Sequence, residues 1–247
     1  PAHTYIRIGM YHDASLANER AIESDNEYVT QCHQQGIYPL GYIPHNHHFL
    51  WATATLEGRK KRSLEAAQAT FDHVDTEMMR EPGMGLLQHY WIIPMYGYVR
   101  FGEWDAMLAY PEPDSELLYP RGVWHYARGM AFLANGQPAE ATTELEKLRV
   151  IAANDSLKDV IVMNHAYDLM QIATRVLEGE IAASQKNYTK AIGLLQEAII
   201  YEDNLRYNEP PDWFFPVRHN LGAVLLDAER SSEAEQVYRA DLTEFPN

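Results

Sequence analysis

The chain has 247 residues, 46% of them hydrophobic, and its 35 acidic and 20 basic residues give a formal net charge of -15. Its length suffices for one large or two ordinary domains. With a mean hydropathy of -0.39 it contains no run near the roughly 18 apolar residues of a membrane span. Because the negative charge repels polyanions, we expect neither nucleic acid nor an acidic membrane surface as a partner.

Neither the cysteine content nor the start of the sequence indicates a compartment. Cys32 is the only cysteine, so no disulfide framework is predicted. The sequence has no starting Met and no signal peptide, and it opens at Pro1 inside a helical pattern. We therefore expect a fragment or processed segment of a longer repeat protein, of undetermined localisation.

The first third of the chain predicts two helical pairs. An amphipathic stretch before Gly9 is followed by a helix over about residues 14–35. Residues 36–44 predict a turn-rich link in which Pro44 opens the next helix, because the first helical position has no hydrogen bond for proline to lose. The next two helices are expected at residues 45–57 and 62–76.

Prolines and capping residues delimit the helices expected in the rest of the chain. Pro111 and Pro113 shorten the helix that follows an aromatic-rich helix at residues 86–101. A long helix is expected over roughly residues 157–184, capped by residues 154–156. Further helices are expected at residues 120–135, 138–153, 188–201, 213–228 and 232–244. Since no segment alternates as a strand does, the predicted fold class is all-α.

A short motif recurs six times: a small or polar residue at a helix break, an aromatic residue or a substitute two positions later, and usually an alanine three positions after that. The breaks fall at Gly9, Gly58, Gly102, Gly136, Lys186 and Glu229, and the trailing residues are Ala14, Ser63, Met107, Ala141, Ala191 and Ala234. Internal repetition of this kind indicates an array of one helix-turn-helix unit. The trailing residues are 34 to 50 positions apart, so helices and links differ in length between units.

These units resemble the tetratricopeptide repeat, a 34-residue helix-turn-helix with small residues at fixed places. The matching residues are Gly129, Phe132 and Ala141; Gly179, Ala191 and Ala198; and Leu221, Gly222, Leu225, Ala234, Tyr238 and Pro246. Met107 and Ser63 depart from the pattern. The resemblance implies one α-α superhelical (solenoid) domain over residues 1–247, right-handed and of about six repeats. These are expected at approximately residues 1–35, 44–76, 86–110, 120–153, 166–201 and 213–246.

Four segments carry a narrower likeness. Residues 1–9, residues 36–39 with 44–49, residues 122–129 and residues 209–213 are similar to segments of a family of bacterial tetratricopeptide proteins. That resemblance implies a bacterial source and the same fold, and it implies no substrate.

In proteins of this class the leading helix of each pair lines a concave inner wall. Taking each break as a common origin and stepping by three and four residues predicts which side chains face this wall. They are His45, His48, His89, Tyr96, Tyr126 and His219. We expect this polar, aromatic wall to bind an extended peptide or a partner protein, which makes the chain a non-enzymatic scaffold without a cofactor.

The histidines leave two other interpretations open. His3, His45 and His48 are predicted to lie on adjacent leading helices, and three imidazoles can hold a divalent transition metal such as zinc, copper or nickel. The same cluster could instead bind a small organic ligand. Alternatively, the histidines stack or hydrogen-bond between helices as part of the packing. No carboxylate is paired with them by spacing, and no motif in the chain predicts a catalytic residue. Self-association, through the ends of the array or by another subunit filling the wall, is a further expectation.

Overall fold

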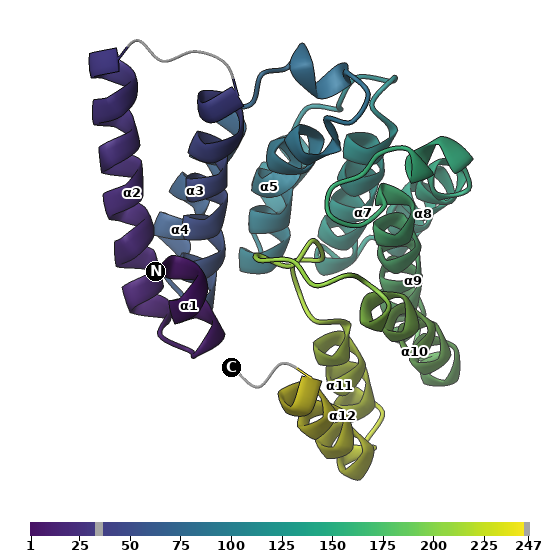
Figure 1. Ribbon diagram of the computed structural model, residues 1–247. Helices are drawn as coiled ribbons and strands as arrows, with labels where there is room; N and C mark the ends of the chain where they lie inside the picture. The colour runs from purple at the N-terminus through teal and green to yellow at the C-terminus, as the bar shows by residue number, and fades with distance from the viewer. Residues whose placement is uncertain (33–36, 245–247) are drawn as a thin grey trace.

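The computed structural model describes residues 1–32 and 37–244, and the side chains among these except for residues 29–39 (Figure 1). Within this part the chain forms twelve α-helices, two short 3-10 helices and no strand, which confirms the all-α fold class. The α-helices are α1 Ala2–Arg7, α2 Tyr11–Cys32, α3 Ile37–Leu56, α4 Lys60–Asp72, α5 Gly85–Phe101, α6 Trp104–Ala109, α7 Leu118–Ala134, α8 Pro138–Ala152, α9 Ala166–Ser184, α10 Tyr188–Asp203, α11 Val217–Asp227 and α12 Ser231–Glu244. The 3-10 helices are η1 Met78–Arg80 and η2 Asp155–Lys158.

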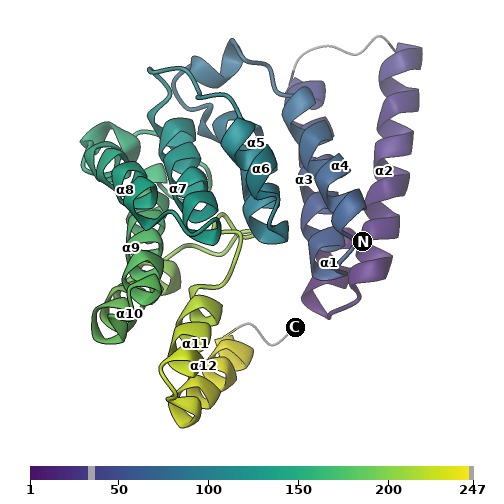
Figure 2. The same cartoon turned by 180° about the vertical axis from the view of Figure 1, so that it is seen from behind.

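Helices that follow one another in the sequence pack against one another as adjacent pairs. Examples are α2 with α3, α3 with α4, α7 with α8, α9 with α10 and α11 with α12. Seen from behind, α8 lies in front of α7 (Figure 2). Among the described residues, no helix is both long and apolar enough to cross a membrane.

The six predicted breaks share one backbone conformation. Gly9, Gly58, Gly102 and Gly136 have φ between 69° and 74°, and Lys186 and Glu229 have φ of 60° and 59°. At each break the following N–H donates to a carbonyl five residues back, as from Glu103 to Tyr98 at 2.9 Å. This is the Schellman arrangement that ends a helix through one left-handed residue. The repeated motif therefore predicted six identical turns correctly.

The residue five positions after each break packs in the interior. Ala14, Ser63, Met107, Ala141 and Ala191 are fully buried, and Ala234 is 1% exposed. Met107 thus occupies the buried position that alanine holds in other units.

The small residues of the repeat pattern also pack where a larger side chain would not fit. A Cβ added at Gly129 would lie 2.6 Å from Leu177, one added at Gly179 would lie 3.1 Å from Leu195, and one added at Gly222 would lie 2.3 Å from Tyr238. Glycine at these positions allows the helices to approach closely.

Two predicted helix boundaries are wrong, one in the expected link at residues 36–44 and one at the start of the helix expected from residue 157. Most of the expected link at residues 36–44 is helical, because α3 begins at Ile37 and contains Pro44. An interior proline costs about 3 kcal/mol, and the burial of Ile43, Phe49 and Leu50 on the same helix offsets it. Gly36 and Pro246, which were expected to mark a link and a repeat end, lie outside the described residues.

The helix expected from residue 157 begins only at Ala166. The side chain of Asn154 accepts the N–H of Ser156, as predicted for a cap, but the turn that it caps is the 3-10 helix η2. Residues 159–165 then form a loop, closed by the N–H of Ala166 donating to the carbonyl of Val160 at 2.8 Å. Hydrogen bonds from Asn164 to a distant segment hold this loop, so a tertiary contact overrides its helical pattern.

Candidate functional site

A non-helical segment of the chain packs on the surface where the sequence predicts an inner wall. Residues 204–216, which we call the strap, connect α10 to α11. The strap passes in front of α7 and α5 in Figure 1 and behind them in Figure 2, so it lies against one side of these helices. The expected helix at residues 213–228 therefore starts late, at Val217, with Pro216 as its N-terminal cap.

Two aromatic side chains of the strap pack against two of the predicted wall residues. The ring of Phe214 stacks on Tyr96 of α5, with centroids 4.3 Å apart, and Trp213 meets Tyr126 of α7 edge-on at 5.3 Å. Tyr96 is fully buried and Tyr126 is 3% exposed. Burial raises the pKa of Tyr126 well above its ordinary value. These two tyrosines thus lie on one surface, as predicted, but they are covered.

The carboxylate of Asp212 anchors the strap. Its Oδ2 accepts the backbone N–H of Asn164 at 3.0 Å and the side-chain Nδ2 of Asn164 at 2.8 Å, while its Oδ1 accepts from Asn208 at 2.6 Å. Asn164 also binds the strap backbone, because its Oδ1 accepts the N–H of Arg206 at 2.6 Å. Asp212 is 2% exposed, so its charge is held by hydrogen bonds rather than by water.

The strap also reaches the first helix of the chain. Glu209 accepts from Nδ1 of His3 at 2.7 Å and lies 3.5 Å from the guanidinium of Arg7, which also lies over the ring of Tyr207. His3 stacks on His45 of α3, with ring centroids 5.5 Å apart. A contact between residues 206 positions apart thereby joins α1 to the segment between α10 and α11.

His48 and His89 form a buried pair. Their rings meet edge to face at 5.4 Å, and His48 also stacks on Trp51. Nδ1 of His89 is 2.8 Å from the hydroxyl of Tyr119, a residue that the sequence analysis did not single out. Burial lowers the pKa of both histidines, although the nearby carboxylate of Asp212 partly raises that of His89. Both imidazoles are therefore neutral near pH 7.

His219 lies apart from the other predicted wall residues. Its Nε2 is 2.8 Å from Oδ2 of Asp241 on α12, and its ring contacts Phe215 of the strap edge-on at 5.2 Å. With a side chain that is 40% exposed, it remains accessible, as the half-buried His45 does.

The three histidines proposed as metal ligands do not form one site. His3 and His45 adjoin Glu209, whereas His48 packs on Trp51, His89 and Tyr90. Within the described part of the chain, no group of three or more His, Cys, Asp or Glu side chains is arranged to hold a metal ion. The prediction failed because helical register fixes the face of a residue but not which neighbour its ring turns toward.

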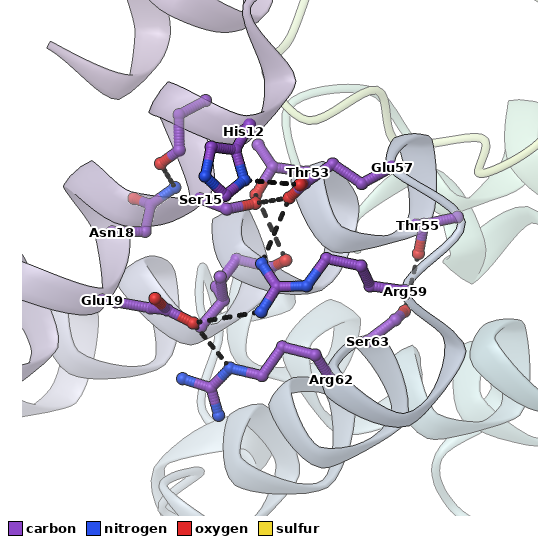
Figure 3. Close-up of polar contacts among 12 residues, drawn as sticks. His12, Ser15, Asn18, Glu19, Thr53, Thr55, Glu57, Arg59, Arg62 and Ser63 are labelled. Carbon is purple, nitrogen blue, oxygen red and sulfur yellow. Dashed lines mark hydrogen bonds and ion pairs between the residues drawn. The ribbon is translucent and has the colours of Figure 1, made fainter.

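The basic run at residues 59–62 is part of a packing network rather than a free patch. Arg59 and Arg62 pair with Glu19 of α2, and Arg59 also bonds Glu57 (Figure 3). Burial alone would raise the pKa of Glu57, but hydrogen bonds from Ser15, His12 and Arg59 outweigh it and hold this pKa low. Because Glu57 accepts from Ser15 and His12 separately, no imidazole bridges a hydroxyl and a carboxylate as in a nucleophile relay.

Two surface hollows, of about 380 Å³ and 290 Å³, lie at the basic turn around Arg62 and beneath Tyr5 of α1. None of the six predicted wall residues lines either hollow.

Comparison with known proteins adds no further assignment. No family model, curated protein or solved structure matches the chain. The site is therefore argued from this chain alone.

The sequence analysis treated the strap mainly as a link. Its Pro-Pro-Asp-Trp run was noted only for a family likeness, and Asp212, Trp213, Phe214 and Asn164 were not proposed as site residues. Two adjacent aromatic residues beside an acid and prolines, between two helices, were the available signal, because a solvated link rarely carries large aromatic side chains.

Proposed function

We propose that the protein is a non-enzymatic scaffold of tetratricopeptide-like repeats, arranged as a superhelix, which binds an extended segment of a peptide or partner protein along its leading helices. The proposed activity needs no metal and no cofactor. The residues expected to contact the ligand are those predicted from the register: His45, His48, His89, Tyr96, Tyr126 and His219.

One observation carries this proposal: the strap, a non-helical segment of the chain, already lies on these helices (Figure 1). Trp213 and Phe214 fit against Tyr96 and Tyr126. Towards α1, the strap makes a further contact through Glu209. Stacking of this type contributes about 0.5–1.5 kcal/mol per pair beyond the area that it buries. A surface that accommodates one non-helical segment has the shape and chemistry to accommodate another.

The repeated turns support the same proposal. Six identical helix ends with a buried trailing residue are typical of units that stack side by side, and stacked helical units create extended binding surfaces.

Selection from a phage-displayed library of random 12-residue peptides tests the function. The targets are the wild-type chain and a Trp213→Ala/Phe214→Ala chain, whose strap aromatic rings are removed. We expect enriched peptides to bind His45→Ala or His219→Ala chains at least tenfold more weakly. They should bind Val150→Ala normally, because Val150 is 76% exposed on α8 and far from the strap contacts. Peptides that bind all these chains equally would refute the proposed function.

A further inference from the structure

We propose that the strap acts as an internal ligand that closes the peptide-binding surface, and that the external partner carries the same chemistry: an acidic residue followed by two aromatic residues. This inference rests on the proposed function and specifies its ligand class. The surface meant here, which we call the strap-binding surface, comprises His89, Tyr96, Tyr119, Tyr126 and Asn164.

The first argument is the carboxylate site. Asn164 offers the Asp212 carboxylate both its backbone N–H, at 3.0 Å, and its side-chain amide, at 2.8 Å. Two donors from one residue, aimed at a carboxylate that is 2% exposed, form a site that recognises an acid by hydrogen bonds. The donors of this site lie in the loop before α9, outside the strap.

The second argument is the pair of aromatic positions next to this site. Tyr96 receives the face of Phe214, and Tyr126 receives the edge of Trp213. Phe215, the next residue, lies under the guanidinium of Arg100 at 4.6 Å. The order of these contacts along the strap, carboxylate and then aromatic rings, defines the order expected in a partner segment.

Imidazole contacts extend the match. The strap brings Glu209 to His3 and places Asp212 near His89. Both acidic side chains of the strap thus lie beside a histidine.

The third argument is that the strap fits imperfectly. The indole Nε1 of Trp213 and the Nε2 of His89 are both buried, and neither hydrogen-bonds to a protein group within the described part of the chain. A buried polar atom without a partner weakens the contact to which it belongs. A partner segment that supplies these bonds would bind the same surface more tightly per contact than the strap does.

Covalent connection compensates for this imperfect fit. The strap is tethered at both ends, to α10 and α11, and a tethered ligand acts at an effective concentration in the millimolar range. A free segment of equal intrinsic affinity therefore competes poorly unless the strap is weakened. The surface is closed by default and opens to a better ligand.

The test is direct binding of a fluorescein-labelled synthetic peptide with the sequence of residues 204–216, followed by fluorescence anisotropy. The receptors are the full wild-type chain and the full Trp213→Ala/Phe214→Ala chain. We expect the variant to bind the peptide with a Kd at least tenfold lower than wild type does. A peptide in which the same Trp and first Phe are alanine should not bind either chain, and Val150→Ala should behave as wild type.

Far-UV circular dichroism shows whether the double variant is folded. If it is not, Asp212→Asn replaces it, because this change keeps both aromatic rings and the size of the side chain while it removes the anchoring charge. We expect at least a threefold lower Kd than wild type for this chain.

Two results would overturn the inference. A folded variant that does not bind the peptide shows that the strap is not a ligand equivalent, and a wild-type chain that binds it as tightly as the variant shows that the strap does not close the surface. Either result leaves the proposed function standing if library peptides still lose affinity on His45→Ala or His219→Ala chains. The function itself fails only if those peptides are insensitive to both substitutions.

Discussion

Replacement of the half-buried Glu202 by glutamine should stabilise the protein increasingly as the pH rises. Glu202 lies at the end of α10, and its carboxylate accepts the N–H of Val217, the first residue of α11, at 3.0 Å. Burial raises the pKa of Glu202 from 4.5 to about 8, and the negative charges of Asp203 and Asp241 add to this, although the Val217 bond and Arg218 act in the opposite direction.

The pH dependence follows from the two pKa values. The folded chain keeps the Glu202 proton up to about pH 8, whereas the unfolded chain releases it near pH 4.5. The favourable contribution of the neutral acid is thus fully present below pH 4.5 and is lost as the pH rises to 8. The loss accumulates at about 1.4 kcal/mol per pH unit, which gives about 3 kcal/mol at pH 7.

Glutamine retains a carbonyl oxygen to accept the Val217 N–H and carries no charge to desolvate. We therefore expect Glu202→Gln to match wild type at pH 4 and to exceed its free energy of unfolding by about 3 kcal/mol at pH 7. Urea denaturation followed by far-UV circular dichroism at pH 4, 5.5, 7 and 8 measures the difference. Glu146→Gln, on an exposed part of α8, is the matched control and should show no such trend. A difference between Glu202→Gln and wild type that stays constant from pH 4 to pH 8 would refute the reasoning.

Three further predictions concern the turns, the close helix contacts and the buried imidazole. Lys186 and Gly136 both have positive φ. Lys186→Gly should therefore raise the free energy of unfolding by about 0.5 kcal/mol, and Gly136→Ala should lower it by about 1 kcal/mol. Urea denaturation at pH 7 measures both, and changes of equal sign would contradict the shared turn geometry. Gly193 lies on α10 with no atom near an added Cβ, so Gly193→Ala should stabilise the protein by about 1 kcal/mol. Gly129→Ala should destabilise it by about 1–3 kcal/mol, because the added Cβ meets a buried leucine. Similar thermal midpoints for the two variants would be inconsistent with the packing. Burial lowers the pKa of His89, so its neutral form contributes stability that is fully present above pH 6.5 and declines as the pH falls. His89→Gln should therefore lose less unfolding free energy than wild type between pH 7 and pH 5. An equal loss in the two chains would argue against a buried neutral imidazole.

Features set by short-range patterns were predictable in this chain. A helix end with a left-handed residue depends on hydrogen bonds that span five residues, as from Glu103 to Tyr98, so a local motif suffices to locate it. The same register placed His48, His89, Tyr96 and Tyr126 on a ligand-facing wall, and in the structure all four are buried. It could not predict their burial, because the side chains that cover them come from elsewhere in the chain.

The failures have a common physical origin. Pro44 lies inside a helix although it was expected to start one, and residues 159–165 form a loop although they were expected to be helical. In both places tertiary contacts outweigh local preference. Of the proposed metal set, His3 and His45 stack on each other, whereas the ring of His48 packs on Trp51 and His89.

By itself, then, the sequence determined an all-helical chain with six equivalent turns and a buried residue after each turn. These follow from helical periodicity and from the few residue types that tolerate a left-handed turn. Only the tertiary structure decided what covers the predicted wall residues. The strap is held by contacts such as that between Asn164 and Asp212, 48 residues apart, and that between His3 and Glu209, 206 residues apart. Pairings over such distances depend on how the whole array packs, which no local pattern encodes.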